Sequence, residues 1–281
     1  MVATPIGNLE DLSPRARRVL AEVSLIAVED TRHTGRLLSR IGVETPTISY
    51  HDHNERSRVQ GLLERLLAGD DVALVSDAGT PLVSDPGYRL VAAAREAGIV
   101  VQAVPGPSAA TAAISIAGLP SDRWVFEGFL PRQGNELRAR LALLAHEPRT
   151  AVIFASVHHL QRTLVALAES LGASRRALLA RELTKLHEES CYGSLGELAE
   201  LSRQGRFSRG EFVLVVGGAG DARASPGSAE IRRIYGVLSA ELPPKQALAL
   251  TVRLSGARRR EVYATLHPGD GASNDPEEPV T

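Results

Sequence analysis

The chain contains one cysteine and no long apolar segment. Cys191 is the only cysteine among the 281 residues, so an internal disulfide and a metal site built from several cysteines are excluded, and a reducing cytoplasm is the simplest location. No apolar run approaches the roughly 20 residues that span a bilayer. The segment after Met1 is strand-like and lacks the basic and apolar parts of a secretory signal. A hydrophobic content of 43% with 23% charged residues predicts a globular protein long enough for two domains.

Lysine is almost absent, and the two signs of charge nearly balance. The net charge of −1 argues against a broadly polycationic protein, although a local basic cluster can still bind RNA. Of the 32 basic residues, only Lys185 and Lys245 are lysines. A lysine kept in so arginine-rich a sequence indicates a position that needs a compact ammonium group. The alternative, that either lysine has simply not mutated, carries equal weight.

Apolar segments of strand length alternate with helix-like segments, which predicts a first α/β domain at residues 1–120. Several helices have clear ends: Pro14 follows the cap Ser13, and an apolar stripe that begins after Asn54 stops at Gly69. The strands lack polar alternation, which is typical of a sheet covered on both faces. The predicted strands are Val2–Thr4, Leu25–Glu29, Thr47–Tyr50, Val72–Ser76 and Val100–Val104.

A second α/β series begins near residue 121 and predicts a domain at residues 121–220, with a ligand cleft between the two domains. Its predicted strands are Trp124–Leu130, Thr150–Ala155, Ala177–Ala180, Glu188–Tyr192 and Glu211–Val216. Its predicted helices are Asn135–Ala145, His158–Leu171 and Ser194–Gln204, the last with a capping-box spacing. Residues 221–266 are expected to form a small helical extension, and the polar, acidic residues 267–281 a disordered tail.

The loop after the fourth predicted strand is the strongest candidate for a ligand site. In an open α/β sheet, ligands bind beyond the carboxyl ends of the strands. Glycines allow close approach of the backbone, prolines stiffen a loop, and carboxylates bind hydroxyl or cationic groups. Two ordinary turns are the alternative, because Asp and Ser favour turns. The loop comprises Asp77, Ala78, Gly79, Thr80 and Pro81, then Ser84, Asp85, Pro86 and Gly87.

Two further loops follow predicted strands. Pro105–Ala109 begins a helix, and the free N–H groups and small residues of this helix start suit an adenine or a ribose. The alternative is a tight turn in which Ser108 only caps the helix. Ala3–Asn8 contains a glycine, but no GxGxxG follows any strand, so a nicotinamide-binding Rossmann site is disfavoured. Gly217–Gly220 lacks the lysine of a phosphate-binding P-loop and is interpreted as a flexible turn.

Two charged segments are candidates for proton transfer or phosphate contact. Glu29–His33 brings acid, hydroxyl and cation together after a strand, or alternatively begins a helix capped by Asp30 or Thr31. Arg181–Glu189 contains Lys185, and its alternative is a solvated run of charge. No HExxH spacing and no GxSxG motif occurs, so neither a metal site nor a serine-hydrolase site is predicted.

Seven motifs follow one another along the chain: Ala3–Asp11, Glu29–Thr34, Ser49–Glu55, Val72–Val91, Pro105–Ala109, Gly118–Arg132 and Arg181–Glu189. In this order they resemble the tetrapyrrole-methylase-like family of S-adenosylmethionine (AdoMet) methyltransferases, the class III methyltransferases. Within that family the resemblance is to the branch that methylates the 2′-oxygen of a cytidine ribose in small-subunit (16S) ribosomal RNA. The segment Ala155–His159 departs from the family, which usually has glutamate, proline and arginine where Ala155, Val157 and His159 stand here.

The resemblance implies two α/β domains with AdoMet in the cleft between them, an RNA substrate and a homodimer. The 230–266 segment is similar to the C-terminal segment of longer members. The cofactor-binding positions expected in this way are Pro5, Asp77, Ala78, Gly79, Thr80, Asp85, Pro105, Gly106, Ser108, Ala109, Ala155, Ser156, Leu183 and Val216.

A ribose 2′-hydroxyl is a poor nucleophile, so an enzyme must align it with the methyl group and help to remove its proton. The hypothesis is that Lys185 lowers the pKa of the hydroxyl or acts as base, that Glu182 orients Lys185, and that Asp30 is the rival base. Two alternatives remain: a methyltransferase of the same fold that acts on a tetrapyrrole or a protein residue, and a non-catalytic RNA-binding protein of ribosome assembly. The expected RNA contacts are Arg32, His33, Arg132, Arg138, Arg140, Arg258, Arg259 and Arg260.

Overall fold

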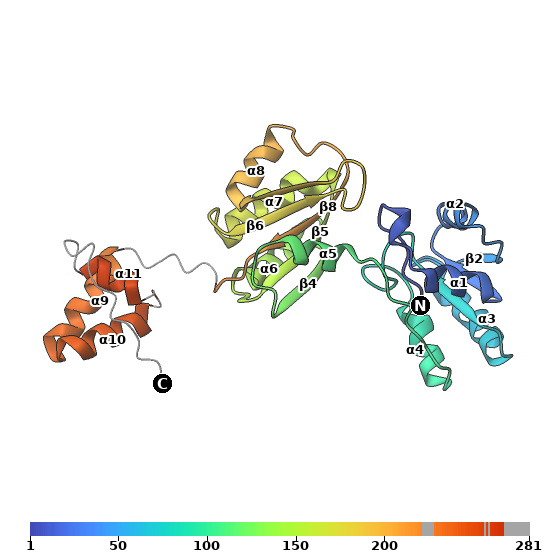
Figure 1. The fold of residues 1–281 in the computed structure, drawn as a ribbon, viewed down its shortest axis with the longest axis horizontal. Helices are drawn as coiled ribbons and strands as arrows, with labels where there is room; N and C mark the ends of the chain where they lie inside the picture. Colours follow the sequence, from blue (N-terminus) through green and yellow to red (C-terminus); the bar gives the residue numbers. More distant parts are fainter. Residues whose placement is uncertain (221–227, 256, 258, 267–281) are drawn as a thin grey trace, which may run out of the picture. The chain divides into compact units, whose positions relative to one another are not determined.

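The computed structural model describes residues 1–220, 228–255, 257 and 259–266, and Figure 1 shows its helices and strands. The chain divides into two compact units, Met1–Gly218 and Ala219–Thr281. The boundary predicted at residue 120 falls inside the first unit. The tail predicted at residues 267–281 lies outside the described residues.

The first sheet is parallel, with the strand order β2-β1-β3. Helices cover both of its faces, as the missing polar alternation predicts. Ile26 and Val28 pack in one apolar cluster, while Leu25 and Ala27 pack in another, because successive strand residues point to opposite faces. The strands are β1 (Leu25–Val28), β2 (Thr47–Ser49) and β3 (Val72–Val75), preceded by the short 3₁₀ helix η1 (Leu9–Asp11). The helices are α1 (Pro14–Glu22) and α2 (Thr31–Ile41) on the first cluster, and α3 (Glu55–Leu67) and α4 (Tyr88–Glu96) on the second.

Two of the predicted strands are reduced to isolated bridges. Val2 donates its N–H to Leu74 O at 3.0 Å, and Val104 donates to Met1 O at 2.8 Å, so both segments extend the sheet locally. Val2 pairs parallel with Val104, whereas Thr4 pairs antiparallel with Gly79, so neither pairing continues over consecutive residues as a strand requires. The predictions of full strands at Val2–Thr4 and Val100–Val104 are therefore wrong.

The second sheet has the order β4-β5-β8-β6-β7. β4 and β5 are parallel, whereas β8 runs antiparallel to both β5 and β6, and β7 is an antiparallel edge strand. Each strand predicted between residues 121 and 220 is present, including the possible strand at Glu188–Tyr192. The strands are β4 (Trp124–Phe129), β5 (Thr150–Ser156), β6 (Arg176–Arg181), β7 (Glu189–Ser194) and β8 (Glu211–Val216).

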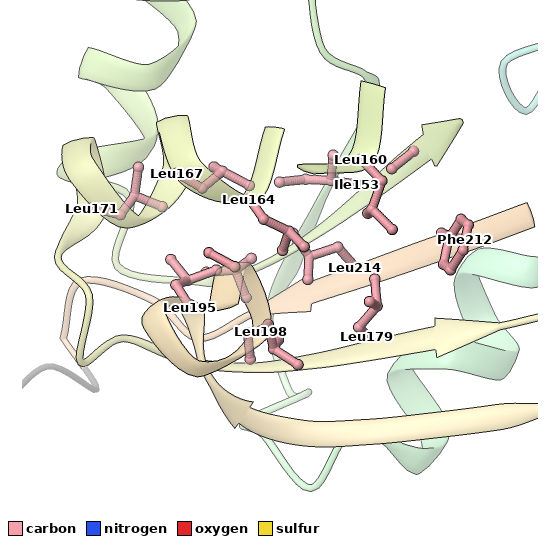
Figure 2. Close-up of a cluster of buried hydrophobic side chains, with 14 of the residues drawn as sticks. Ile153, Leu160, Leu164, Leu167, Leu171, Leu179, Leu195, Leu198, Phe212 and Leu214 are labelled. Carbon is pink, nitrogen blue, oxygen red and sulfur yellow. The ribbon is translucent and has the colours of Figure 1, made fainter. Parts of the chain in front are cut away.

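Both faces of the second sheet are buried. On one face, Ile153, Leu179 and Leu214 pack against helices that include α7 (Val157–Leu171), as Figure 2 shows. The capping box predicted at Ser194 begins α8 (Leu195–Arg203), which packs on the same face with α6 (Gly134–Ala145). The opposite face is covered by α5 (Ala109–Ile116), a helix that precedes the predicted domain boundary yet packs on the second sheet. α5 thus connects the loop at its own N-terminus to the core of the second sheet.

The second unit contains three helices in its described part, in agreement with the predicted helical extension. They are α9 (Ser228–Glu241), α10 (Pro244–Ser255) and α11 (Arg259–Leu266). Ile231, Ala257 and Val262 form their small core. Within the described residues of the chain, no helix combines the length and the apolar character that a membrane crossing requires.

Candidate active site

A cavity of about 530 Å³ opens where the carboxyl ends of β1, β3 and β5 meet the start of β8. Its volume lies in the range of small-molecule sites in proteins. Most of the predicted cofactor positions line it: Asp77, Ala78, Gly79, Thr80, Asp85, Ser108, Ala109, Ala155, Ser156 and Leu183. The structure therefore brings together, around one space, loops that are far apart in the sequence.

The three predicted ligand loops are joined by hydrogen bonds. Thr4 and Gly79 exchange backbone hydrogen bonds of 2.9 and 3.0 Å, which tie the first loop to the loop after β3. Thr80 Oγ1 donates to Pro107 O at 3.0 Å and ties that loop to the start of α5. Leu82 and Ser84 have φ angles of 72° and 68°, a left-handed conformation that is strained for residues other than glycine. Such strain persists only where the surroundings hold the loop in place.

Four of the predicted cofactor positions do not line the cavity: Pro5, Pro105, Gly106 and Val216. Gly106 supports the first loop instead, because a Cβ atom there would come within 3.0 Å of Ala3 Cβ. Val216 is 1% exposed and lies at the opposite end of β8 from the cavity residues Glu211 and Val213.

Several lining residues were not predicted as cofactor positions: Ile6, Glu29, Val83, Ser84, Phe129, Phe154, Val157, Gly210, Glu211, Phe212 and Val213. Glu211, Phe212 and Val213 begin β8 and reach the cavity because β8 is antiparallel to β5. An antiparallel strand brings its amino end to the edge at which its neighbours end. The rule that ligands lie after strands could not find them, since strand direction is not visible in the sequence.

Three carboxylates, Glu29, Asp77 and Asp85, gather on one side of the cavity. Burial, followed by the charges of Asp85 and Asp77, raises the pKa of Glu29 above its ordinary value. Burial, with the charges of Asp77 and Asp52, likewise raises the pKa of Asp85, although a hydrogen bond with Ser76 opposes the shift. Carboxylates so arranged favour a cationic ligand, which would relieve their mutual repulsion.

Asp30 does not line the cavity but caps α2. Its Oδ1 accepts hydrogen bonds from the N–H groups of Arg32 at 2.7 Å and His33 at 3.4 Å, as the alternative interpretation of this segment predicts. The Arg32 side chain also lies 3.1 Å from Asp30 Oδ2. The hydrogen bond from the Arg32 side chain is the main reason that the pKa of Asp30 falls to about 2. A carboxylate with so low a pKa is a weak proton acceptor.

Lys185 lies beside the cavity and is held by two carboxylates. Its Nζ donates to Glu211 Oε2 at 2.7 Å and to Glu182 Oε1 at 3.1 Å, and Glu211 itself lines the cavity. Burial alone would lower the pKa of Lys185, but the hydrogen bonds to Glu211 and Glu182 outweigh it and the pKa is raised. Lys185 is therefore a protonated ammonium at neutral pH, suited to stabilising negative charge and not to accepting a proton.

The loop that carries Lys185 is strained and closely packed. Glu182 and Thr184 have φ angles of 52° and 65°. A Cβ atom at Gly7 would come within 2.8 Å of Thr184 Oγ1 and closer still to Lys185 Cγ. The first loop thus needs glycine at this position in order to press against the Lys185 loop.

A second cavity, of about 420 Å³, adjoins the first and shares Phe129, Phe154, Ala155 and Ser156 with it. Of the predicted RNA contacts, Arg132 lines this second cavity. Its other lining residues are Leu130, Pro131, Leu137, His158, His159, Arg162 and Thr163.

Arg32, His33, Arg138 and Arg140, four further predicted RNA contacts, line neither cavity. Arg138 is hydrogen-bonded to Asn135, and Arg140 pairs with Glu127 at 3.3 Å. Arg258 and the side chains of Arg259 and Arg260 lie outside the described part of the structure, so the RNA contacts predicted for them stay predictions. Among the described residues, no group of three or more His, Cys, Asp or Glu side chains is placed to hold a metal ion.

Comparisons with known proteins identify relatives along the whole chain. Residues 1–199 match the family of tetrapyrrole (corrin/porphyrin) methylases, and residues 225–267 match the RsmI C-terminal HTH domain. The chain is 49% identical over 264 residues to ribosomal RNA small subunit methyltransferase I of Xylella fastidiosa, covering 94% of this chain and 96% of the relative. It is 48% identical to the protein of the same name from Pseudomonas aeruginosa, covering 97% of this chain and 98% of the relative.

The solved structures that resemble the chain show its fold. Uroporphyrin-III C-methyltransferase of Thermus thermophilus, complexed with S-adenosyl homocysteine, superposes with a TM-score of 0.53 at 20% identity. The superposition covers 77% of this chain and 95% of that one.

Proposed function

The chain belongs to the ribosomal RNA small subunit methyltransferase I family of tetrapyrrole methylases, and on this basis we propose that it methylates small-subunit ribosomal RNA with AdoMet as the donor. The acceptor is the 2′-oxygen of a cytidine ribose in 16S RNA. The observation that carries the proposal is the cavity of about 530 Å³, because the predicted cofactor loops converge on it in a chain whose relatives are RNA methyltransferases. A cavity with this lining, in a chain with these relatives, supports an enzyme and not a purely RNA-binding protein.

The lining of the first cavity fits AdoMet, so we call it the donor cavity. AdoMet supplies a methyl group on a sulfonium centre and carries a second positive charge on its amino group. Glu29, Asp77 and Asp85 provide the compensating negative charge. The small residues Ala78, Gly79 and Ala109 allow an adenosine to approach the backbone closely. Desolvated carboxylates with raised pKa values are typical of functional sites.

On the acceptor side, Lys185 is the residue proposed to act on the 2′-hydroxyl. Its ammonium group is held beside the donor cavity by Glu182 and Glu211. A fixed positive charge near the hydroxyl lowers the pKa of the hydroxyl and stabilises the oxyanion as the proton leaves. Of the two roles predicted for Lys185, its raised pKa supports electrostatic stabilisation and not general-base catalysis. Asp30, with a pKa of about 2, is the weaker candidate for the base.

The finer features of the proposal rest on family membership for the homodimer, on the single cysteine for the location, and on the positions of basic residues for the RNA contacts. We propose a cytoplasmic homodimer that contacts RNA through Arg132 and through basic residues on other elements. These are Arg32, His33, Arg138, Arg140, Arg258, Arg259 and Arg260. The match of residues 225–267 to an RsmI C-terminal HTH domain supports a role in RNA binding for the second unit.

Mapping of methyl groups in 16S RNA by mass spectrometry, in cells with and without this chain, tests the proposal. The expected result is the loss of one cytidine 2′-O-methyl group in cells without the chain, restored by the purified protein and AdoMet on isolated small subunits. An unchanged methylation map would contradict the proposal. If the protein instead methylates a tetrapyrrole, it belongs to the tetrapyrrole-methylating branch of the family. If calorimetry detects no binding of AdoMet, a non-catalytic role is favoured.

A further inference from the structure

The second cavity differs from the donor cavity in charge. Two guanidinium groups line it, those of Arg132 and Arg162, together with the imidazoles of His158 and His159. None of the described residues in its lining is acidic, whereas the donor cavity contains Glu29, Asp77, Asp85 and Glu211. The second cavity is therefore the more favourable of the two for an anion.

The start of α7 adds further hydrogen-bond donors to the second cavity. Ser156 caps α7, but its side chain makes no capping hydrogen bond. The first N–H groups of an α-helix have no partner within the helix, and its N-terminus carries a partial positive charge. Residues from this first turn, His158 and His159, line the cavity. The helix start and the arginines therefore converge on one space.

A contact between Arg162 and His159 orients two of these donors. Arg162 Nη2 lies 3.2 Å from His159 Nδ1. An arginine can only donate, so Nδ1 accepts and Nε2 carries the proton of the imidazole. Nε2–H is then a further donor on the same ring. Bonded in this way, the two side chains hold each other in place.

The guanidinium groups of Arg132 and Arg162 keep their capacity to bind an anion. Neither forms an ion pair with a carboxylate among the described residues, in contrast to Arg140, which pairs with Glu127 at 3.3 Å. Guanidinium groups bind phosphate with two parallel hydrogen bonds, which gives both affinity and orientation.

We propose that the second cavity binds the backbone phosphate next to the methylated ribose; this inference rests on the proposed function. The wall shared by the two cavities separates the methyl donor from the phosphate. Phe129 and Phe154 form part of that wall with ring centroids 5.6 Å apart, and the Phe129 residue is 59% exposed. A ribose over this wall has a phosphate on each side of it in the strand. One of these phosphates enters the second cavity while the 2′-hydroxyl faces the donor cavity.

The test uses Arg132→Gln and Arg162→Gln, singly and together, in the full chain. The probe is a small ribosomal subunit isolated from cells that lack this protein. Each variant is expected to bind the particle about tenfold more weakly, since each loses a charge-assisted hydrogen bond to phosphate. The slope of log affinity against log salt concentration is expected to become shallower by about 0.7 to 1 for each arginine removed.

Two further readouts separate RNA binding from folding and from donor binding. The AdoMet Kd, measured by calorimetry, is expected to be unchanged in all the variants. The KM for the particle is expected to rise while kcat changes little, because a phosphate contact is made equally in the ground state and the transition state. Arg203→Gln is the matched control. Arg203 is exposed on α8 and paired with Glu200, so its removal takes away one charge outside both cavities and is expected to change the particle Kd within about twofold.

Three outcomes would overturn the inference. If the double variant binds the particle with wild-type affinity and salt slope while the wild type methylates RNA, the phosphate site is wrong and the proposed function stands. If the variants lose AdoMet affinity, the second cavity belongs to the donor site. If the wild type methylates no RNA, the proposed function fails and the inference fails with it.

Discussion

Lys185 Nζ donates a hydrogen bond of 2.7 Å to Glu211 Oε2, and Glu211 is itself part of the wall of the donor cavity. The two residues come from different elements, the loop after β6 and the first position of β8, which are neighbours only because these strands pair antiparallel. The pair places a protonated ammonium group beside the space proposed for the methyl donor. The hydrogen bonds to Glu211 and Glu182 fix the position of this charge.

Lys185→Met tests the role of this ammonium group. We expect kcat for RNA methylation to fall about 10²- to 10³-fold, the usual effect of removing one electrostatic stabiliser of a developing oxyanion. Lys185→Arg retains the charge but not its compact geometry and is expected to recover part of the activity. Single-turnover rates at saturating RNA and AdoMet give the measurement. Full activity of Lys185→Met with normal AdoMet affinity would remove Lys185 from the mechanism.

Gly7→Ala tests whether the first loop positions the lysine. The added methyl group would meet Lys185 Cγ and approach Thr184 Oγ1 to 2.8 Å, so the Lys185 loop must shift. We expect kcat to fall about tenfold or more, since small displacements of a catalytic group are costly. Gly61→Ala on α3, where a Cβ atom meets nothing within 4 Å, is the control and should retain wild-type activity. Equal activities of the two variants would contradict the positioning role.

Glu29→Gln separates donor binding from stability. The pKa of Glu29 is raised from 4.5 by burial and by the charges of Asp85 and Asp77. A carboxyl group whose pKa is higher in the folded state stabilises the fold at pH values below 4.5, and that contribution is lost as the pH rises through the raised value. At neutral pH the variant removes an unfavourable charge, so the unliganded protein is expected to melt at a higher temperature than the wild type.

The same substitution is expected to weaken AdoMet binding about tenfold at neutral pH, because a carboxylate that faces a cationic ligand is lost. In the wild type, AdoMet affinity should fall as the pH drops toward the raised pKa of Glu29, and this dependence should be shallower in Glu29→Gln. Thermal melting and calorimetry at several pH values provide the measurements. A variant that is less stable and binds AdoMet normally would refute the assignment.

Asp30 can be tested as a cap by two substitutions. Asn caps a helix as well as Asp does but cannot accept a proton. Ala can neither cap the helix with its side chain nor accept a proton. Asp30→Asn is therefore expected to keep both the melting temperature and the methylation rate. Asp30→Ala should lower the melting temperature by a few degrees, because the N–H groups of Arg32 and His33 lose their acceptor. A large loss of kcat in Asp30→Asn would instead restore Asp30 as a candidate base.

Leu164→Ala tests the core beneath α7. Leu164 is 0% exposed and packs among the residues shown in Figure 2. We expect a loss of about 2–5 kcal/mol in the free energy of unfolding, measured with denaturant. Leu143→Ala on α6 removes the same atoms from a residue that is 67% exposed, and it should change stability by about 0.5 kcal/mol or less. A similar loss in both variants would mean that burial does not set the difference.

Much of the fold could be predicted because many helices and strands are determined by residues that are close together in the sequence. The apolar strands, the capping box at Ser194 and the helix α3, which ends two residues before Gly69, depend on neighbouring residues alone. The loops after β1 and β3 could be found because parallel strands end at one edge of a sheet. The predictions failed where the local pattern and the strand pairing disagree, as at Val2–Thr4, a strand-like sequence that pairs at one end with Val104 and at the other with Gly79.

The sequence by itself determined the α/β class and the family, and it predicted the loops Asp77–Asp85 and Ser108–Ala109 that the structure brings to one cavity, since these depend on residue type and order. Only the tertiary structure decided that Glu211 reaches the cavity, that Asp30 is a cap, that Lys185 is held by Glu182 and Glu211, and that Arg132 and Arg162 line one space. The physical reason is that charge, burial and strand direction are properties of neighbours in space. Residues that are neighbours in space can lie far apart along the chain, so a local sequence pattern cannot predict these contacts.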